Sequence, residues 1–289
     1  MLEKVRIYTK ERFPLIPLFL YSLLTVTAIG TLFEKKPQFR IVLVLSFIYL
    51  GFWFHLRVLD EFKDYKFDLK YHPDRPIAKG IISLKEVKYA DILTAALMIF
   101  LSFIITRNVI FVLFLISFGY TFLMFKEFFV ENFSDRKTTL YIIAHEVVFL
   151  PLLLFFYSVF NGFLWLPLTI SSTTHFLYVL APITLIEIGR KIKHRTGIAG
   201  KKTSDTYAFR WGQEKTIYIF ALLILIIGVI SFFIENFSNL MSLVIVLFSS
   251  FVFAGGKYFR KIVARSSMGI TTIISFALLI FLIASYYAK

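Results

Sequence analysis

The sequence contains no cysteine. This absence excludes a disulfide framework, a thiolate metal site and a cysteine nucleophile. Charge is also scarce, because only 17% of the residues are charged, whereas soluble domains carry about a quarter. Acids are the rarest of these, with 18 Asp and Glu against 32 Lys and Arg. The positions of the few carboxylates are therefore informative.

Apolar residues make up 58% of the 289 residues and come in long, nearly uncharged blocks. Such blocks, when about 18 residues or longer, indicate transmembrane helices. We therefore predict an all-α polytopic membrane bundle, with about nine transmembrane helices in one domain covering residues 1–289. The predicted helices lie at 13–33, 41–59, 88–106, 109–126, 138–160, 163–188, 215–234, 239–256 and 267–287.

The basic residues orient this bundle. With nine helices, 27 of the 32 Lys and Arg fall on the side of the N-terminus, and cationic loops stay cytoplasmic. We expect an integral protein of a bacterial or archaeal plasma membrane with its N-terminus in the cytoplasm. The net charge of +14 then reflects topology and attraction to anionic membrane lipid, and the sequence carries no nucleic-acid-binding signature.

Two long polar segments, 60–87 and 189–214, fall on the predicted cytoplasmic side. Long loops of this kind usually carry function. They follow the second and the sixth predicted helices. This spacing suggests two related four-helix halves and one extra helix.

The first of these segments begins with four acids. If the second helix continues through residue 70, Asp60, Asp64 and Asp68 lie at i, i+4 and i+8, with Glu61 beside them. Like charges at this spacing repel one another. A Mg²⁺ ion would offset the repulsion, because it binds carboxylate oxygens, waters and phosphate oxygens together.

A helix end exposed to water is the competing interpretation of these acids, because interleaved lysines could pair with them. The lysines are Lys63, Lys66 and Lys70. Beyond them, Pro73 and Pro76 are expected to end the helix. Arg75 and Lys79 follow, and both suit an anionic group such as phosphate.

The stretch "DEFKDYKFDLKYHPDRPIAKG" closely resembles the first aspartate-rich motif of the UbiA superfamily of intramembrane prenyltransferases. That motif reads Asn-Asp-x-x-Asp-x-x-x-Asp, followed by Arg-Pro and then Gly. Asp64 and Asp68 match it, as do the Arg-Pro pair and the glycine. Asp60 stands in place of its asparagine, and Glu61 in place of its first aspartate.

The resemblance implies a membrane-embedded, Mg²⁺-dependent transferase. In it, a central cavity open to the cytoplasmic side takes a prenyl diphosphate, and Mg²⁺ bridges the aspartate-rich motifs and the diphosphate. Loss of diphosphate leaves an allylic carbocation, which a small aromatic or lipid acceptor attacks. The implied metal ligands are Asp60, Glu61, Asp64 and Asp68, of which Asp64 and Asp68 are also assigned to catalysis. Arg75 and Lys79 are the implied phosphate ligands.

The family's second motif, Asp-x-x-x-Asp, is altered in this sequence. Glu187 takes the first position, Lys191 takes the second, and the next acid is Asp205. The following "DTYAFRWG" resembles the family's entry into the seventh helix. The resemblance implies Glu187 as a catalytic acid and Arg190, Lys191 and Tyr207 as substrate ligands. Three interpretations stay open: one main metal cluster, completion of the site by Asp205, or a different diphosphate donor.

Other functions also remain open. One is phosphoribosyl-type transfer to a polyprenyl phosphate within the same superfamily. A second is a membrane permease, whose acids tend to lie at mid-membrane on broken helices. A third is a degenerate relative without activity. Four intramembrane residues are further candidates for acceptor contact or proton transfer, and a hydrogen bond between helices is the plainer role for each. They are His55, His145, Glu146 and His175.

Overall fold

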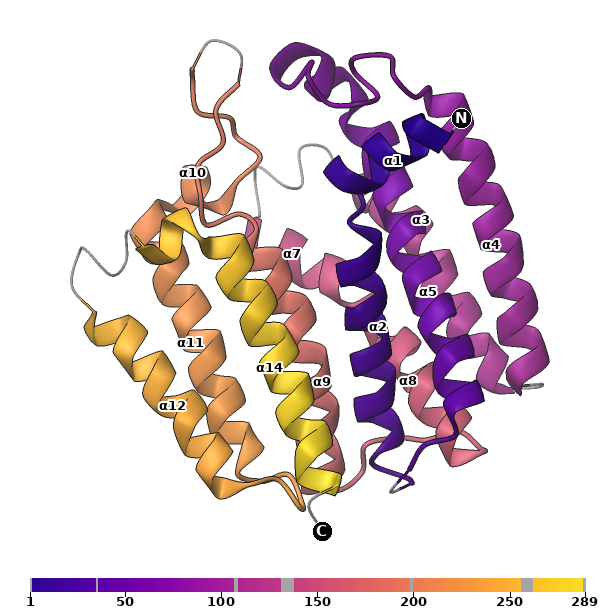
Figure 1. The fold of residues 1–289 in the computed structure, drawn as a ribbon, viewed down its shortest axis with the longest axis vertical. Coiled ribbons are helices and arrows are strands. Elements are labelled where there is room, and N and C mark those ends of the chain that lie inside the picture. The colour runs from indigo at the N-terminus through magenta and orange to yellow at the C-terminus, as the bar shows by residue number, and fades with distance from the viewer. Residues whose placement is uncertain are drawn as a thin grey trace. The chain divides into compact units, whose positions relative to one another are not determined.

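The structure is a computed structural model that describes residues 2–34, 36–106, 109–130, 138–197, 200–255 and 262–287. The chain forms two compact units, Met1–Trp165 and Leu166–Lys289 (Figure 1). The described elements are helices joined by turns and loops. The all-α class is therefore confirmed, whereas the single domain over residues 1–289 stays a prediction.

The first unit is built around one long helix. Its central helix, α3, packs against both α2 and α4, and α5 packs against α8 (Figure 1). Buried rings fill the space between these helices, with Tyr49 lying against Tyr21, Trp53 and Phe156. The elements of this unit are α1 (Leu2–Glu11), α2 (Leu15–Gly30), α3 (Phe39–Tyr71), α4 (Leu84–Thr106), α5 (Val109–Phe125), η1 (Glu127–Phe129), α7 (Thr138–Glu146) and α8 (Phe149–Asn161).

Helix α3 continues well past its apolar part, as the acid spacing predicts. It has 33 residues and is therefore about 50 Å long, whereas about 20 residues suffice to cross a membrane. With the charged end, Arg57–Tyr71, the helix is thus longer than a membrane crossing requires. The helix ends where the His72 backbone N–H donates to the Asp68 carbonyl. His72 leaves the helical conformation because it precedes Pro73.

The predicted helix 138–160 is broken in the structure. It forms α7 and α8, separated by a turn at residues 147–148. Hydroxyls on α5 satisfy carbonyls near the break: Ser117 Oγ donates to Val148 at 2.6 Å and the Tyr120 hydroxyl donates to Ala144 at 2.9 Å. Apolar periodicity shows a helix but not such a break, because the break depends on donors from another helix.

The second unit packs α9 against both α11 and α14, and α11 against α12 (Figure 1). Helix α9 starts seven residues later than predicted, because Thr169 and Ser172 form a capping box at its N-terminus. Small polar residues join α11 to α12, where Ser231 donates to Ser242 at 2.7 Å. The helices are α9 (Ile170–Gly189), α10 (Tyr207–Trp211), α11 (Gln213–Ser231), α12 (Asn239–Ala254) and α14 (Ser267–Tyr287).

By length and composition, the described residues contain fewer candidate membrane-spanning helices than the nine predicted. Within the described residues, five helices are long and apolar enough to cross a membrane, or six if α1 and α2, bent by 59°, form one span. Helices α5 and α12 are apolar but shorter. The polytopic membrane class is confirmed, while the count of nine spans, the central cavity and the orientation stay predictions.

Gly189, at the end of α9, offers a test of helix packing in the second unit. An alanine methyl at this position would lie 2.7 Å from the Thr271 Cβ on α14, so Gly189→Ala is expected to cost about 1–3 kcal/mol through overpacking. Gly119→Ala on α5 is the matched control, because nothing lies within 4 Å of its added methyl. Thermal unfolding in detergent checks both, and equal melting temperatures would contradict the packing of α9 on α14.

Candidate functional site

Four acids on the charged end of α3 form the first cluster, defined as Asp60, Glu61, Asp64 and Asp68. The continuous helix places three of them at intervals of four residues, hence on one face, as predicted. Their surroundings differ. Glu61 and Asp68 are buried, whereas the Asp60 side chain is 46% exposed and Asp64 is partly buried.

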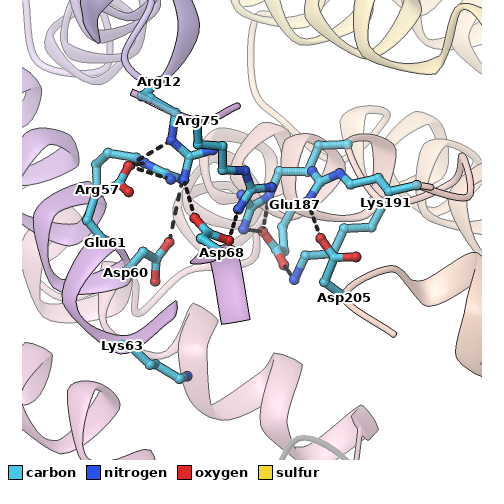
Figure 2. Close-up of polar contacts among 12 residues, drawn as sticks. Arg12, Arg57, Asp60, Glu61, Lys63, Asp68, Arg75, Glu187, Lys191 and Asp205 are labelled. Atoms are coloured by element: carbon cyan, nitrogen blue, oxygen red, sulfur yellow. Dashed lines mark hydrogen bonds and ion pairs between the residues drawn. The ribbon is translucent and has the colours of Figure 1, made fainter. Parts of the chain in front are cut away.

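Glu61 is held between two arginines (Figure 2). Its Oε1 accepts from Arg12 Nε at 2.8 Å and from Arg57 at 2.7 and 2.9 Å. Arg57 lies one helical turn before it, and Arg12 comes from the segment between α1 and α2. A buried carboxylate is stable only when paired in this way. Glu61 is therefore already neutralised by the protein.

Asp68 is paired at the other end of the cluster. Its Oδ1 accepts from Arg75 Nη1, and its Oδ2 lies 3.6 Å from Arg12 Nη2. The turn after α3 brings Arg75 back, because backbone bonds from Arg75 to His72 and from Lys79 to Arg75 fold it tightly. Lys79 stays exposed at the end of this turn. The predicted phosphate ligand Arg75 thus forms an ion pair with Asp68, a predicted metal ligand.

A small apolar core fixes Arg12 over the cluster. Tyr8 and Phe13, on either side of Arg12, pack with Val58 of α3 and with Ile77 and Ile82 of the following turn. Because all of these side chains are buried, α1 cannot shift without exposing them to water. The placement of Arg12 is therefore a consequence of packing.

Asp60 and Asp64 have few partners. Asp60 has one distant ion pair, with Arg57 Nη1 at 4.0 Å. For Asp64, no hydrogen bond or ion pair joins it to any residue that the structure describes. Burial, together with the nearby carboxylates of Asp60 and Asp68, raises the pKa of Asp64 to about 6, although the positive charges of Lys63 and Arg57 act to lower it. A cation at this position would offset the repulsion between these carboxylates and stabilise the ionised form of Asp64.

This pair fits Mg²⁺ better than the full set of four acids does. Mg²⁺ commonly takes one or two carboxylates and completes its shell with waters and substrate phosphates. Within the described ranges, no three Asp, Glu or His side chains are grouped closely enough to hold a metal by themselves. The residues present therefore fit a metal that arrives with a phosphate ligand, at Asp60 and Asp64.

Of the lysines between the acids, Lys63 makes its hydrogen bond and its ion pair with residues outside the first cluster. Lys63 Nζ lies 2.8 Å from Glu127 Oε1 and donates to the Tyr141 hydroxyl at 3.0 Å. Lys66 and Lys70 are exposed. The salt bridges formed by the four acids to residues in the described part of the chain are to arginines. Among the described residues, the ion pairs of these acids are therefore with arginines rather than with the interleaved lysines.

His55 forms a buried network between three helices. Its Nδ1 lies 2.9 Å from Asp91 Oδ1 on α4, and its Nε2 lies 3.1 Å from Thr121 Oγ1 on α5. The imidazole also stacks on Phe118. These contacts match the expected hydrogen bond between helices. His145 makes a local contact with the Tyr141 carbonyl at 2.8 Å, and His175 is buried against the Tyr286 ring.

The second unit carries the second cluster, defined as Glu187, Arg190, Lys191 and Tyr207. Glu187 Oε1 lies 2.7 Å from Lys191 Nζ (Figure 2). The same oxygen accepts from the Tyr207 hydroxyl at 2.7 Å, and Oε2 accepts from Arg190 at 2.6 Å. All four residues are in the predicted set, and the structure brings them together. Asp205 binds Arg195 at 2.7 Å and accepts from Thr203.

Two residues of the first cluster's surroundings are absent from the sequence-based set. Arg57 had a detectable signal, because its spacing of four residues from Glu61 is that of a helical ion pair. Arg12 had none, since it lies 49 residues from Glu61 in the sequence. Its role depends on how α1 folds onto α3.

Comparison with known proteins agrees with this fold. A family model described as the UbiA prenyltransferase family matches residues 22–276. One similar solved structure is that of a digeranylgeranylglyceryl phosphate synthase, with a TM-score of 0.62, 15% identity, and coverage of 99% of this chain and 100% of the other. Another, a UbiA homolog from Archaeoglobus fulgidus bound to DMAPP and Mg²⁺, has a TM-score of 0.50, 12% identity, and coverage of 96% and 99%. A search of curated protein sequences found no match.

Proposed function

Since the chain belongs to the UbiA prenyltransferase family, we propose that it moves a prenyl group from a prenyl diphosphate to a hydrophobic acceptor in a Mg²⁺-dependent reaction. The observation that carries this proposal is the pair Asp60 and Asp64. These two carboxylates share one helix face, and Asp64 has no pairing group in the described part of the chain. A divalent cation bound to a phosphate would supply the positive charge that these two carboxylates require.

Asp60 and Asp64 would hold the Mg²⁺ ion in this proposal. When bound, the ion neutralises negative charge that develops on the departing diphosphate. Glu61 is left out of the ligand set, since its carboxylate is committed to Arg12 and Arg57. It acts instead as the anchor that holds both guanidinium groups next to the metal ligands.

Arg75 and Lys79 would bind the diphosphate oxygens. Arg75 is held by Asp68, so its guanidinium is oriented before the substrate arrives, and little entropy is lost on binding. Asp68 is thereby a positioning residue for Arg75. Lys79 extends from the exposed end of the same turn and adds a second positive charge.

The chemical step breaks the bond between the allylic carbon and the diphosphate oxygen, and the electron pair leaves with the diphosphate. The acceptor then bonds to that carbon and loses a proton. Fixed positive charges near the leaving group favour this bond cleavage, because they stabilise the negative charge that develops on the diphosphate in the transition state. An apolar environment protects the carbocation from water.

The solved relatives indicate which substrates to test. One is named for digeranylgeranylglyceryl phosphate and the other was bound to DMAPP. We infer an isoprenoid donor and an aromatic or lipid acceptor for this chain as well. We place it as an integral membrane protein with a cytoplasmic N-terminus, on the bias of its basic residues. A permease is disfavoured, because transporter acids tend to lie on broken helices, whereas the first cluster of this chain lies on the continuous helix α3.

Removal of the metal tests the proposal directly. Purified protein is expected to bind geranyl or geranylgeranyl diphosphate in the presence of Mg²⁺ and to lose at least about tenfold in affinity in EDTA, a difference of about 1.4 kcal/mol. Isothermal titration calorimetry measures both. Phosphoribosyl diphosphate in the same assay tests the alternative donor. Affinity for prenyl diphosphates that does not depend on Mg²⁺ would contradict the proposed function.

A further inference from the structure

We propose that Arg12 is a positioning residue that makes cation binding at the first cluster depend on the diphosphate. Arg12 holds two of the four acids of that cluster, so the acids do not retain Mg²⁺ alone and the ion enters together with the diphosphate. The inference rests on the proposed function and deepens it. The residues that carry it all belong to the first unit.

Arg12 spans one side of the acidic face of α3. Its Nε donates to Glu61 Oε1 at 2.8 Å, and its Nη2 lies 3.6 Å from Asp68 Oδ2. On a continuous helix, the spacing from Glu61 to Asp68 corresponds to about 20° around the axis and about 10 Å along it. A single guanidinium group therefore contacts two acids that lie about two helical turns apart.

The proposed metal pair lies on a neighbouring side of the same helix. At about 100° per residue, the line through Asp60 and Asp64 is rotated by about 70° from the line through Glu61 and Asp68. Among the described residues, the ion pairs of Arg12 are with Glu61 and Asp68. Arg12 thus neutralises one side of the helix without pairing with the two acids on the other side.

The charges of the first cluster nearly cancel. Three of its four acids form ion pairs with arginines in the described part of the chain, namely Arg12, Arg57 and Arg75. Four carboxylates and three guanidinium groups leave one net negative charge, which attracts a divalent cation only weakly next to water. In agreement, no three Asp, Glu or His side chains of the described ranges are grouped closely enough to hold a metal.

Packing fixes Arg12 in this position. Its backbone N–H donates to the Tyr8 carbonyl at 2.8 Å, and the Tyr8 ring belongs to the apolar core that joins α1 to α3. Near the other end of α1, Lys4 Nζ lies 2.9 Å from Glu86 Oε1 on α4. The Arg12 side chain itself is only 11% exposed. Mg²⁺ alone would therefore have to displace a firmly held guanidinium group to reach the two acids that Arg12 contacts.

Diphosphate supplies what the first cluster lacks. Mg²⁺ binds to one or two carboxylates when phosphate oxygens and waters complete its shell, and Asp60 and Asp64 offer that number. Without Arg12, Glu61 would keep only Arg57 and Asp68 would keep only Arg75 as arginine partners among the described residues. The cluster would then carry two net negative charges, so it would attract a divalent cation more strongly and could bind it without phosphate.

Binding of Mn²⁺ in the absence of diphosphate tests the inference, with Mn²⁺ as the spectroscopic probe of the Mg²⁺ site. Electron paramagnetic resonance of the full chain in detergent is expected to show weak binding by the wild type and at least about tenfold tighter binding by Arg12→Gln. Lys10→Gln is the matched control, because Lys10 is an exposed cation on α1, and it should stay within about twofold of the wild type. Equal Mn²⁺ affinity of the wild type and Arg12→Gln would overturn the proposal.

A double variant separates the effect of charge from misfolding. Arg12→Gln/Glu61→Gln has the same net charge at the first cluster as the wild type, so its Mn²⁺ affinity should return to within about threefold of the wild-type value. Misfolding would weaken binding in both variants rather than strengthen it in one, and melting temperatures monitor it. Tight binding that persists in the double variant would also overturn the proposal.

Failure of the proposed function is distinguishable in the same assay. Inorganic diphosphate is expected to raise the Mn²⁺ affinity of the wild type at least about tenfold. If diphosphate does so but Arg12→Gln binds Mn²⁺ alone no better than the wild type, the inference fails and the proposed function stands. If diphosphate leaves the Mn²⁺ affinity of the wild type unchanged, the proposed function fails together with the inference.

Discussion

Asp64→Asn is expected to reduce Mg²⁺-dependent prenyl transfer by about a hundredfold or more, equivalent to a loss of about 2.7 kcal/mol of transition-state stabilisation. The substitution keeps the size of the side chain but removes the negative charge that would hold the metal. Because Asp64 has no hydrogen-bonding or ion-pairing partner among the described residues, the variant should fold normally. Turnover of radiolabelled geranylgeranyl diphosphate at several Mg²⁺ concentrations measures the effect.

The matched control for this variant is Asp74→Asn. Asp74 is an acid of the same segment and is exposed, so its replacement should leave turnover and Mg²⁺ dependence unchanged. A loss of activity that higher Mg²⁺ partly restores would identify Asp64 as a metal ligand. If Asp64→Asn keeps full activity, the metal site is not at the first cluster.

Glu61→Ala is expected to lower the free energy of unfolding by about 3–5 kcal/mol, because it leaves two partly buried guanidinium groups without their shared carboxylate. Glu61 accepts from both Arg12 and Arg57 and is only 2% exposed. Thermal or denaturant unfolding of the detergent-solubilised protein measures the loss. A large loss of stability would support an anchoring role for Glu61, whereas a metal ligand would show reduced Mg²⁺ affinity with little loss of stability.

A double-mutant cycle of Glu61→Ala with Arg12→Ala tests the contact itself, since partners in a buried pair couple strongly. The reference is the pair Lys4 and Glu86, which joins α1 to α4 across 2.9 Å but is nearly half exposed. Exposed pairs of this kind contribute less than about 1 kcal/mol. Equal coupling in the two cycles would contradict the role assigned to Glu61.

The first cluster was largely predictable because its geometry is local. Asp60, Asp64 and Asp68 share a face as soon as α3 is helical through Tyr71, and Pro73 determines where it ends. The pairing of these acids was not predictable. Lys63 is next to Asp64 in the sequence, yet it pairs with Glu127, while Arg12 reaches Glu61 from the segment between α1 and α2.

In the second cluster, too, the positions of the residues were predictable and their contacts were not. The sequence alone shows a lysine at position 191, where the resemblance calls for an acid. It leaves open whether Asp205 compensates. In the structure Arg195 and Thr203 bind Asp205, and Lys191 contacts Glu187, while completion of a metal site by Asp205 stays a prediction. Spacing along a chain does not determine such contacts when the partners lie on opposite sides of a loop.

By itself, the sequence determined the all-helical membrane class, the family and the positions of both clusters. Hydrophobic blocks and helical spacing are properties of neighbouring residues, so they can be read without a fold. Only the tertiary structure decided which of the first cluster's carboxylates are paired with arginines. A buried charge pairs with the oppositely charged group that tertiary packing places beside it. Here the apolar core around Tyr8 and Phe13 places Arg12 beside Glu61.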